Sequence, residues 1–184
     1  MQSEKLIQSL IVQTNQIIDQ VENLKNLDLS HLTWRENPAS WNILECLEHL
    51  NLYGAFYLPE IEDKMRESEA VSDAEFTSGF LGNYFVKSIL PQENMKTIKT
   101  FKNKNPLNAN LDKGTLEKFI NQQAKLLDLL NQSRSISLNK VRIKTTISPF
   151  IKIKLGDAFQ FLINHIIRHL NQIEKLKTNT ERIS

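Results

Sequence analysis

Hydrophobic residues recur along much of this chain at spacings of three, four and seven, which is the period of an amphipathic helix. The clearest stretch is residues 3–26, where Gln, Asn and Glu separate the apolar positions Leu6, Leu10, Ile11, Ile17, Ile18, Val21 and Leu24. The same spacing predicts further helices over residues 42–66, 113–133 and 156–177. We therefore expect four helices of about 20 residues each and almost no strand.

The second of these helices carries a start signal and an interruption. Asn42 and Glu45 have the spacing of a capping box, in which the first side chain caps the helix and the second reaches back. Pro59 lies inside the helix, where it has no N–H to donate, so we expect a kink there. Apolar residues lie on two opposite sides of this helix. It should therefore be buried on both sides, and His49 should not face bulk water.

The connections set the expected topology. Residues 26–40 read as a link and residues 67–111 as a longer, less regular one, with a short helix over 80–86. Residues 141–144 alternate briefly like a strand. A link as long as 67–111 can return the chain across a bundle. We predict an all-α, four-helix bundle, up-down-down-up, with a long crossover between helices 2 and 3, and a single domain over 1–184.

Composition narrows the class of protein. Hydrophobic residues make up 40% of the 184, charged residues 24%, and the net charge is +2. These values are ordinary for a soluble globular protein, and the near-balanced charge argues against nucleic acid as the main partner. The single cysteine, Cys46, permits no internal disulfide and reads as a small buried hydrophobe. We expect no signal peptide and no membrane span, and a cytoplasmic location.

Three histidines are the strongest sign of chemistry. His165 and His169 are four residues apart on one predicted helix, so their rings share a face, and His49 lies on another predicted helix. Three neutral imidazoles around one divalent metal leave a coordination position free, which is the pattern of catalytic sites. Zinc, nickel, copper and iron all accept such ligands. The competing interpretation is that these are boundary or structural histidines on amphipathic helices.

A few neighbouring residues could complete the site. Tyr53 and Phe56 share the face of His49 and either line a substrate pocket or pack in the core. Gln172 is the best placed of the polar residues nearby to orient a ligand. Glu45, one turn before His49, is either a partner of that histidine or only the helix cap. No residue is identified as a catalytic acid, base or nucleophile.

Basic residues are concentrated between the third and fourth predicted helices, together with Phe150: Lys140, Arg142, Lys144, Lys152 and Lys154. A solvated surface is the plainest interpretation. An anion site for a carboxylate-bearing substrate is the sharper alternative. Nucleic-acid binding comes third, because no recognition motif accompanies the charge.

Two segments carry a resemblance to a known family. The chain contains PASWNILECLEHL at residues 38–50, with His49 eight residues after Trp41, and HIIRHLNQI at residues 165–173. In both it resembles the DinB/YfiT-like superfamily of four-helix bundles, over about residues 5–177. The resemblance implies a divalent metal, zinc or nickel, held by His49, His165 and His169. It also implies, for some members, S-transferase or related activity with low-molecular-weight thiols.

One position departs from the family pattern. Members often carry an acidic residue directly after the first histidine of the last helix, whereas this chain has Ile166. The resemblance therefore does not supply a general acid or base. Our leading hypothesis is a metal-dependent transferase or hydrolase acting on a small electrophile, with the metal activating a thiol or water. The alternative is a non-enzymatic stress or interaction module. A monomer and a homodimer both stay open.

Overall fold

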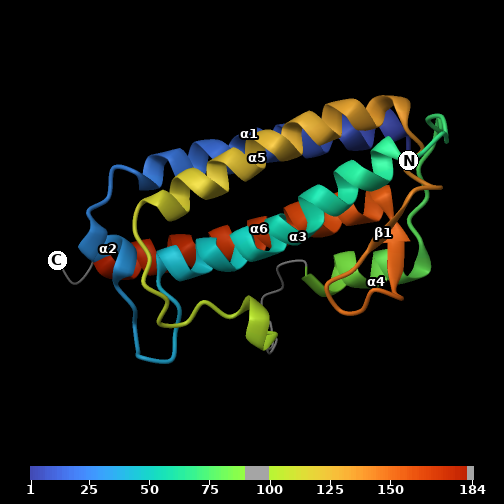
Figure 1. Ribbon diagram of the computed structural model, residues 1–184. Coiled ribbons are helices and arrows are strands. Elements are labelled where there is room, and N and C mark those ends of the chain that lie inside the picture. Colours follow the sequence, from blue (N-terminus) through green and yellow to red (C-terminus); the bar gives the residue numbers. More distant parts are fainter. Residues whose placement is uncertain (90–99, 182–184) are drawn as a thin grey trace.

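The computed structural model describes residues 1–89 and 100–181 and is mostly helical (Figure 1). The helices and strands, with two short 3₁₀ turns, follow in chain order: α1 Ser3–Leu24, α2 Leu29–Thr33, α3 Ile43–Arg66, α4 Phe80–Ile89, η1 Lys102–Lys104, α5 Gly114–Gln132, η2 Ser133–Ser135, β1 Arg142–Lys144, β2 Lys152–Lys154 and α6 Leu155–Glu181. The prediction of an all-α fold is confirmed, with one small two-stranded sheet added.

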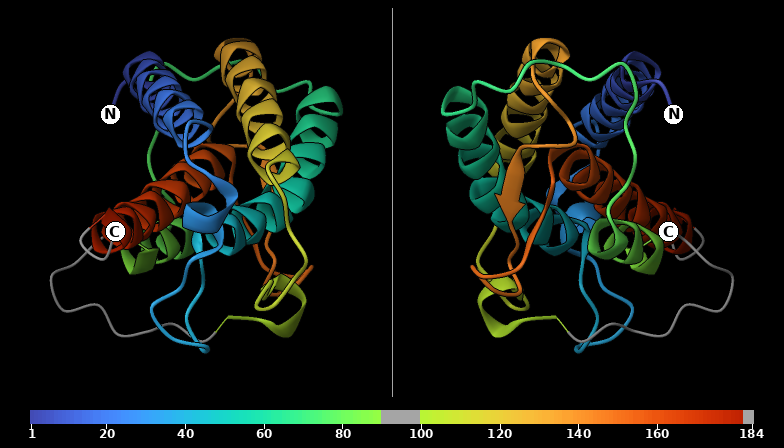
Figure 2. Two further views of the ribbon diagram at one scale, coloured as in Figure 1. Left: turned by 90° about the vertical axis from the view of Figure 1, so that its left-hand side faces the viewer. Right: turned by 90° about the vertical axis from the view of Figure 1, so that its right-hand side faces the viewer.

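Four long helices enclose the core. α1 packs against α5 and α6, and α3 packs against the same two helices from the other side (Figure 2). α3 and α5 run in one direction, and α1 and α6 run in the opposite one (Figure 1). The apolar stripes of all four meet between them, because each stripe can leave water only against another. Fully buried core residues include Val21, Leu47, Ile61, Phe119, Leu126, Phe159 and Ile163.

α3 begins and bends as its sequence predicts. The Asn42 side chain accepts a hydrogen bond from the backbone N–H of Glu45, and the Glu45 carboxylate accepts one from the backbone N–H of Asn42. The capping box is therefore confirmed. Figure 1 shows α3 changing direction in its C-terminal half, which contains Pro59. A proline removes a helical hydrogen bond and crowds the preceding turn, so a bend is expected there.

Two elements escaped the sequence prediction. α2 occupies part of the 26–40 link and is only five residues long, too short to show a helical period. β2 pairs antiparallel with β1, and Ile143 lies opposite Ile153. The alternation over 141–144 is confirmed as β1. Residues 151–154 repeat it, and this was the available signal for β2. The two isoleucines face the core. The basic residues on either side of each isoleucine therefore point to the opposite face of the hairpin.

The described parts of the long link between α3 and α5 contact the rest of the fold. Val71 forms an isolated bridge with Ile136, and Gln2 forms one with Glu75. α4 then packs against α6. The predicted helix over 80–86 is confirmed within α4, and residues 90–99 of the link lie outside the described part of the chain.

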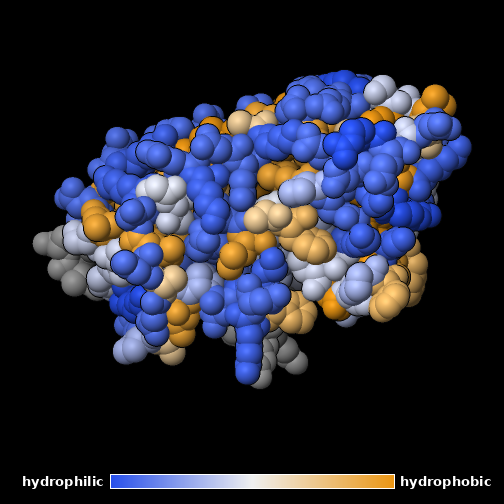
Figure 3. All heavy atoms as spheres, viewed as in Figure 1, coloured by the Kyte–Doolittle hydropathy of each residue, from blue (hydrophilic) through white to orange (hydrophobic). Residues whose placement is uncertain are grey.

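Hydrophilic side chains cover most of the face seen in Figure 3, and hydrophobic ones form separate patches. Among the described residues, none of the helices is both long and apolar enough to cross a membrane.

Asp157, in the first turn of α6, ties α4 to the helix layer. Its carboxylate is fully buried and accepts hydrogen bonds from the Ser78 hydroxyl and, at 2.9 Å, from the backbone N–H of Gly79. Gly82 lies directly against it: a Cβ at that position would be 2.1 Å from Cγ of Asp157. The absence of a side chain at Gly82 therefore lets α4 approach the buried carboxylate.

The Gly82→Ala variant is expected to unfold about 2 kcal/mol more easily, because an added methyl group must push α4 away from Asp157. The matched control is Gly79→Ala, whose added Cβ would come no nearer than 3.3 Å to the same carboxylate. Urea unfolding of both variants measures the difference. Equal midpoints would show that the close approach of α4 does not limit stability.

Candidate metal centre

The structure brings the three predicted histidines together. His49 projects from the second turn of α3, and His165 and His169 project from one face of α6. The ring centroid of His49 is 5.1 Å from that of His165 and 4.8 Å from that of His169, and the two α6 rings are 4.8 Å apart. The rings are only 3%, 4% and 9% exposed, in sequence order.

The Nε2 atoms of the three rings face one another. Nε2 of His165 lies 3.2 Å from Nε2 of His49 and 3.1 Å from Nε2 of His169. One ligand atom from each of the three residues lies within 4.8 Å of the others, so the cluster is close enough to bind a metal ion. Zinc–nitrogen bonds of about 2.0–2.1 Å in tetrahedral geometry place neighbouring nitrogens about 3.3 Å apart. The two separations measured from Nε2 of His165 are close to that value.

Hydrogen bonds at the other ring nitrogen set the tautomer of two histidines. Nδ1–H of His49 donates to the backbone carbonyl of Lys104 at 2.6 Å. Nδ1–H of His169 donates to Oε1 of Gln172 at 3.1 Å. With the proton on Nδ1, each Nε2 presents a lone pair to the cluster, which is the form that binds a metal. Gln172 thus orients His169.

His165 supplies a test of whether the residues suit a cation. Its Nδ1 is buried and has no hydrogen-bond partner. Its Nε2 faces two lone pairs and, if protonated, can satisfy only one of them well, which leaves polar atoms unpaired in a buried place. A cation between the rings would accept all three lone pairs at once. The donor set therefore fits a divalent metal.

Burial keeps the three rings neutral. It lowers the pKa of His49 to about 4 and that of His169 to about 3, and it lowers the pKa of His165 well below its usual range. The neighbouring positive charges of Lys104 and Arg168 act in the same direction. Neutral imidazole is the form required of a metal ligand.

The metal-free protein is expected to lose stability as the pH falls below about 6.5. Between that pH and about 4 the histidines of the unfolded chain bind protons, whereas the buried rings do not. The free energy of unfolding should therefore fall by up to about 1.4 kcal/mol per pH unit for each histidine. Urea unfolding at about pH 7.5, 6.5 and 5.5 measures this slope, and a His49→Leu variant should flatten it. The same slope in both proteins would contradict a neutral, buried His49.

Aromatic rings surround the histidines. Trp41 lies 4.7 Å from His49 and 5.9 Å from His169, centroid to centroid, and its indole N–H donates to Oδ1 of Asn105 at 3.0 Å. Tyr53 lies 5.0 Å from His49 and 4.5 Å from His165. Of the two predicted lining residues, Tyr53 is therefore against the cluster. Phe56 instead packs on Tyr57, at 5.0 Å.

Glu45 holds the loops around the cluster. Its carboxylate is fully buried, pairs with Arg35 at 3.0 Å and accepts the backbone N–H of Asn108 at 2.5 Å, in addition to closing the capping box. None of these hydrogen bonds is to His49. Its influence on that histidine runs through the 104–108 loop, whose Lys104 carbonyl holds Nδ1. Asn108 adopts a positive φ of 62° at this contact, as Asn tolerates better than most residues.

Lys104 and Arg35 were not predicted as site residues. Both lie in connecting segments, where hydrophobic residues show no regular spacing. A short run of lysines was the only signal near Lys104. Cys46 is fully buried, and burial raises the pKa of its thiol, as expected of a packing residue. Ile166 is buried in the core at 3% exposure, so the position next to His165 offers no acid or base.

Several of the basic residues around the β-hairpin already have partners. Lys154 donates to the Thr77 carbonyl at 2.5 Å, Lys144 lies 3.7 Å from the Glu60 carboxylate, and Arg142 donates to the Asn139 carbonyl at 3.0 Å. These contacts favour a structural role for the predicted patch.

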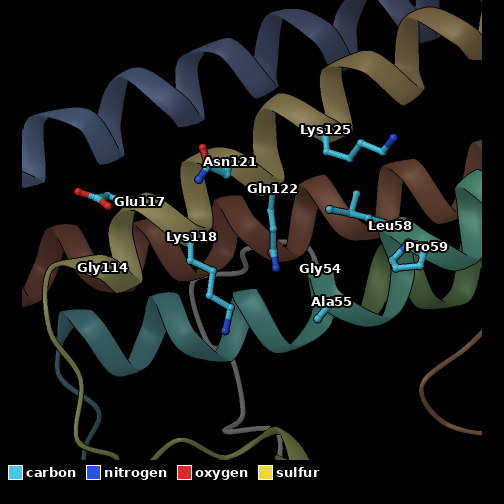
Figure 4. A pocket seen from close by; sticks show the side chains of 10 residues that line it. All are labelled: Gly54, Ala55, Leu58, Pro59, Gly114, Glu117, Lys118, Asn121, Gln122 and Lys125. Atoms are coloured by element: carbon cyan, nitrogen blue, oxygen red, sulfur yellow. The ribbon is translucent and has the colours of Figure 1, made fainter.

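One cavity lies away from the histidines. It has a volume of about 560 Å³ and opens between α3 and α5 (Figure 4). Its lining residues are Gly54, Ala55, Leu58, Pro59, Gly114, Glu117, Lys118, Asn121, Gln122 and Lys125. We therefore treat this groove as separate from the metal centre.

Comparison with known proteins gives one result. The search of curated proteins and the search of solved structures found no match. The family model of the DinB superfamily matches residues 13–173, a span that includes all three clustered histidines. The chain therefore belongs to the DinB superfamily.

Proposed function

We propose that this protein is a metal-dependent enzyme of the thiol S-transferase or hydrolase type, built on an up-down-down-up four-helix bundle. The observation that carries the proposal is the mutual approach of three buried Nε2 atoms that carry no charge. His49, His165 and His169 would hold one divalent ion, zinc or nickel. When bound, such an ion lowers the pKa of a coordinated thiol or water.

The surrounding residues would do the rest by positioning. The Lys104 carbonyl and Gln172 keep His49 and His169 in the ligand tautomer. Trp41 and Tyr53 exclude water from the cluster and offer an apolar wall for a small electrophile. None of the residues around the cluster is proposed as a general acid or base.

The competing proposal is a non-enzymatic interaction module with a vestigial histidine cluster. It is favoured by the near-complete burial of the rings and by the position of the 560 Å³ cavity, which opens between α3 and α5 and not at the histidines. The oligomeric state, monomer or homodimer, and a cytoplasmic location are parts of either proposal.

An assay of metal-loaded protein separates the two. Zinc- or nickel-loaded protein should accelerate the reaction of a low-molecular-weight thiol with 1-chloro-2,4-dinitrobenzene, or the hydrolysis of a nitrophenyl ester. Chelator-treated protein and a His169→Ala variant should not. Rates equal to those of the chelated protein in both assays would favour the interaction module.

A further inference from the structure

Lys104 places a positive charge beside the histidine cluster. Its ammonium group lies 5.5 Å from the centroid of Tyr53 and 5.8 Å from that of Phe56, and it donates to the Leu52 carbonyl at 2.6 Å. Tyr53 is the same ring that contacts His49 and His165. The charge is therefore held against the aromatic wall of the site, across one ring from the imidazoles.

Among the described residues, this charge has no acidic partner. Among the side chains that the structure describes, no carboxylate lies within ion-pair distance of Lys104, whereas the three lysines of α3 and α5 each have one. Arg168, between His165 and His169 on α6, likewise forms no ion pair in the described part of the chain. Both side chains are half-buried. A partly desolvated cation without a counter-ion favours a ligand that supplies the opposite charge.

The ligands of the centre add to this imbalance. Three neutral imidazoles leave the double charge of a divalent ion uncompensated, and the buried carboxylate nearest in sequence, that of Glu45, is already engaged by Arg35 and Asn108. A site with this excess of positive charge attracts anions and stabilises them where water is excluded.

We infer that the site binds a small molecule that carries an anionic group, such as a carboxylate, in addition to its metal-binding atom, and that Lys104 is the residue that selects for that group. This inference rests on the proposed function. Lys104 has two separate parts in it: the backbone carbonyl orients His49, whereas the ammonium group recognises the ligand.

Two matched thiols test the inference on cobalt-substituted protein. 3-Mercaptopropionate and 3-mercaptopropan-1-ol have the same chain and differ in charge. Their binding is followed by the sulfur-to-cobalt charge-transfer absorbance, a readout independent of turnover. We expect the acid to bind about tenfold more tightly than the alcohol, a preference that weakens with added salt.

Variants assign the preference to a residue. Lys104→Met should reduce it to about twofold or less while the alcohol still binds, and Lys104→Arg, which keeps the charge, should retain it. Lys5→Met is the control for net charge. Lys5 is exposed on the first turn of α1, at the other end of the molecule from the start of α3 (Figure 1).

The outcomes separate the two proposals. Equal binding of both thiols by the unmodified protein, or an unchanged preference in Lys104→Met, would overturn the role of Lys104 and leave the metal centre intact. If the protein binds neither cobalt nor either thiol, the proposed function fails, and the inference fails with it. Comparison of the two thiols on the unmodified protein does not depend on whether a variant folds.

Discussion

The His165→Ala variant is expected to lose tight binding of a divalent metal while its helices stay folded. His165 is the central residue of the cluster, because its Nε2 is the atom that lies within 3.2 Å of both other Nε2 atoms. Loss of a residue that only hydrogen-bonds to a metal ligand weakens metal affinity by up to about 100-fold. Loss of the ligand itself should therefore weaken it by more than that. The purified protein should retain about one ion per chain and the variant none.

Stability provides a second measurement of the same change. A ligand that binds only the folded state raises the free energy of unfolding, by about 2.7 kcal/mol at 100 times its Kd. Added zinc should therefore stabilise the unmodified protein and leave His165→Ala unchanged. Without metal the variant should also lose stability, because the ring that it removes is buried against Tyr53 and Phe161. The change on adding zinc is therefore the measurement that tests the site.

His31→Ala is the matched control, because His31 is half-buried on α2 and does not belong to the cluster. Its metal content should equal that of the unmodified protein. Full retention of metal by His165→Ala, measured in buffer free of chelators and above pH 7, would show that the cluster is not the binding site. Acidic buffer must be avoided, because protonated imidazole releases metal.

Replacement of Glu45 by Ala is expected to have the largest effect on stability. It leaves the half-buried Arg35 guanidinium without its carboxylate and the backbone N–H groups of Asn42 and Asn108 without their acceptor. Removal of one partner of a buried ion pair typically costs about 3–5 kcal/mol. Urea unfolding measures the loss.

The same variant should also weaken metal binding, by about 10- to 100-fold. Without Glu45 the 104–108 loop loses its anchor, and the Lys104 carbonyl no longer holds His49 in its ligand tautomer. Asn42→Ala is the control. It removes the helix cap, which should lower the free energy of unfolding by about 1 kcal/mol, and it leaves the Glu45 carboxylate in place. If Glu45→Ala is as stable as Asn42→Ala, Glu45 contributes to stability only as part of the helix cap.

The helices could be predicted because their information is local. The spacing of Leu6, Leu10 and Ile17 reports one buried face of α1, and Asn42 with Glu45 marks the start of α3 within four residues. α2 and β2 were not predicted, because elements of five and three residues are too short to show a helical or strand-like spacing of hydrophobic residues.

Only part of the candidate site could be predicted from the sequence. His165 and His169 share a helix face by spacing alone. His49 was a candidate because it lies on another predicted helix among apolar residues, and the family resemblance implies the same residue. Lys104, Trp41 and Asn105 come from segments without a regular period. Their contacts with the histidines and with one another depend on how the long link returns to α3.

By itself the sequence determined the helical class, the start of α3 and the three imidazoles as a possible ligand set, because periodicity, a capping box and i, i+4 spacing are properties of neighbouring residues. The tertiary structure alone decided that the three histidines meet, which ring nitrogen of His49 carries the proton, and that Lys104 has no acidic partner among the described residues. His49 is 55 residues from Lys104 and 116 residues from His165 in the chain, and only the packing of α3 against α6 and the return of the link to α3 bring these residues into contact.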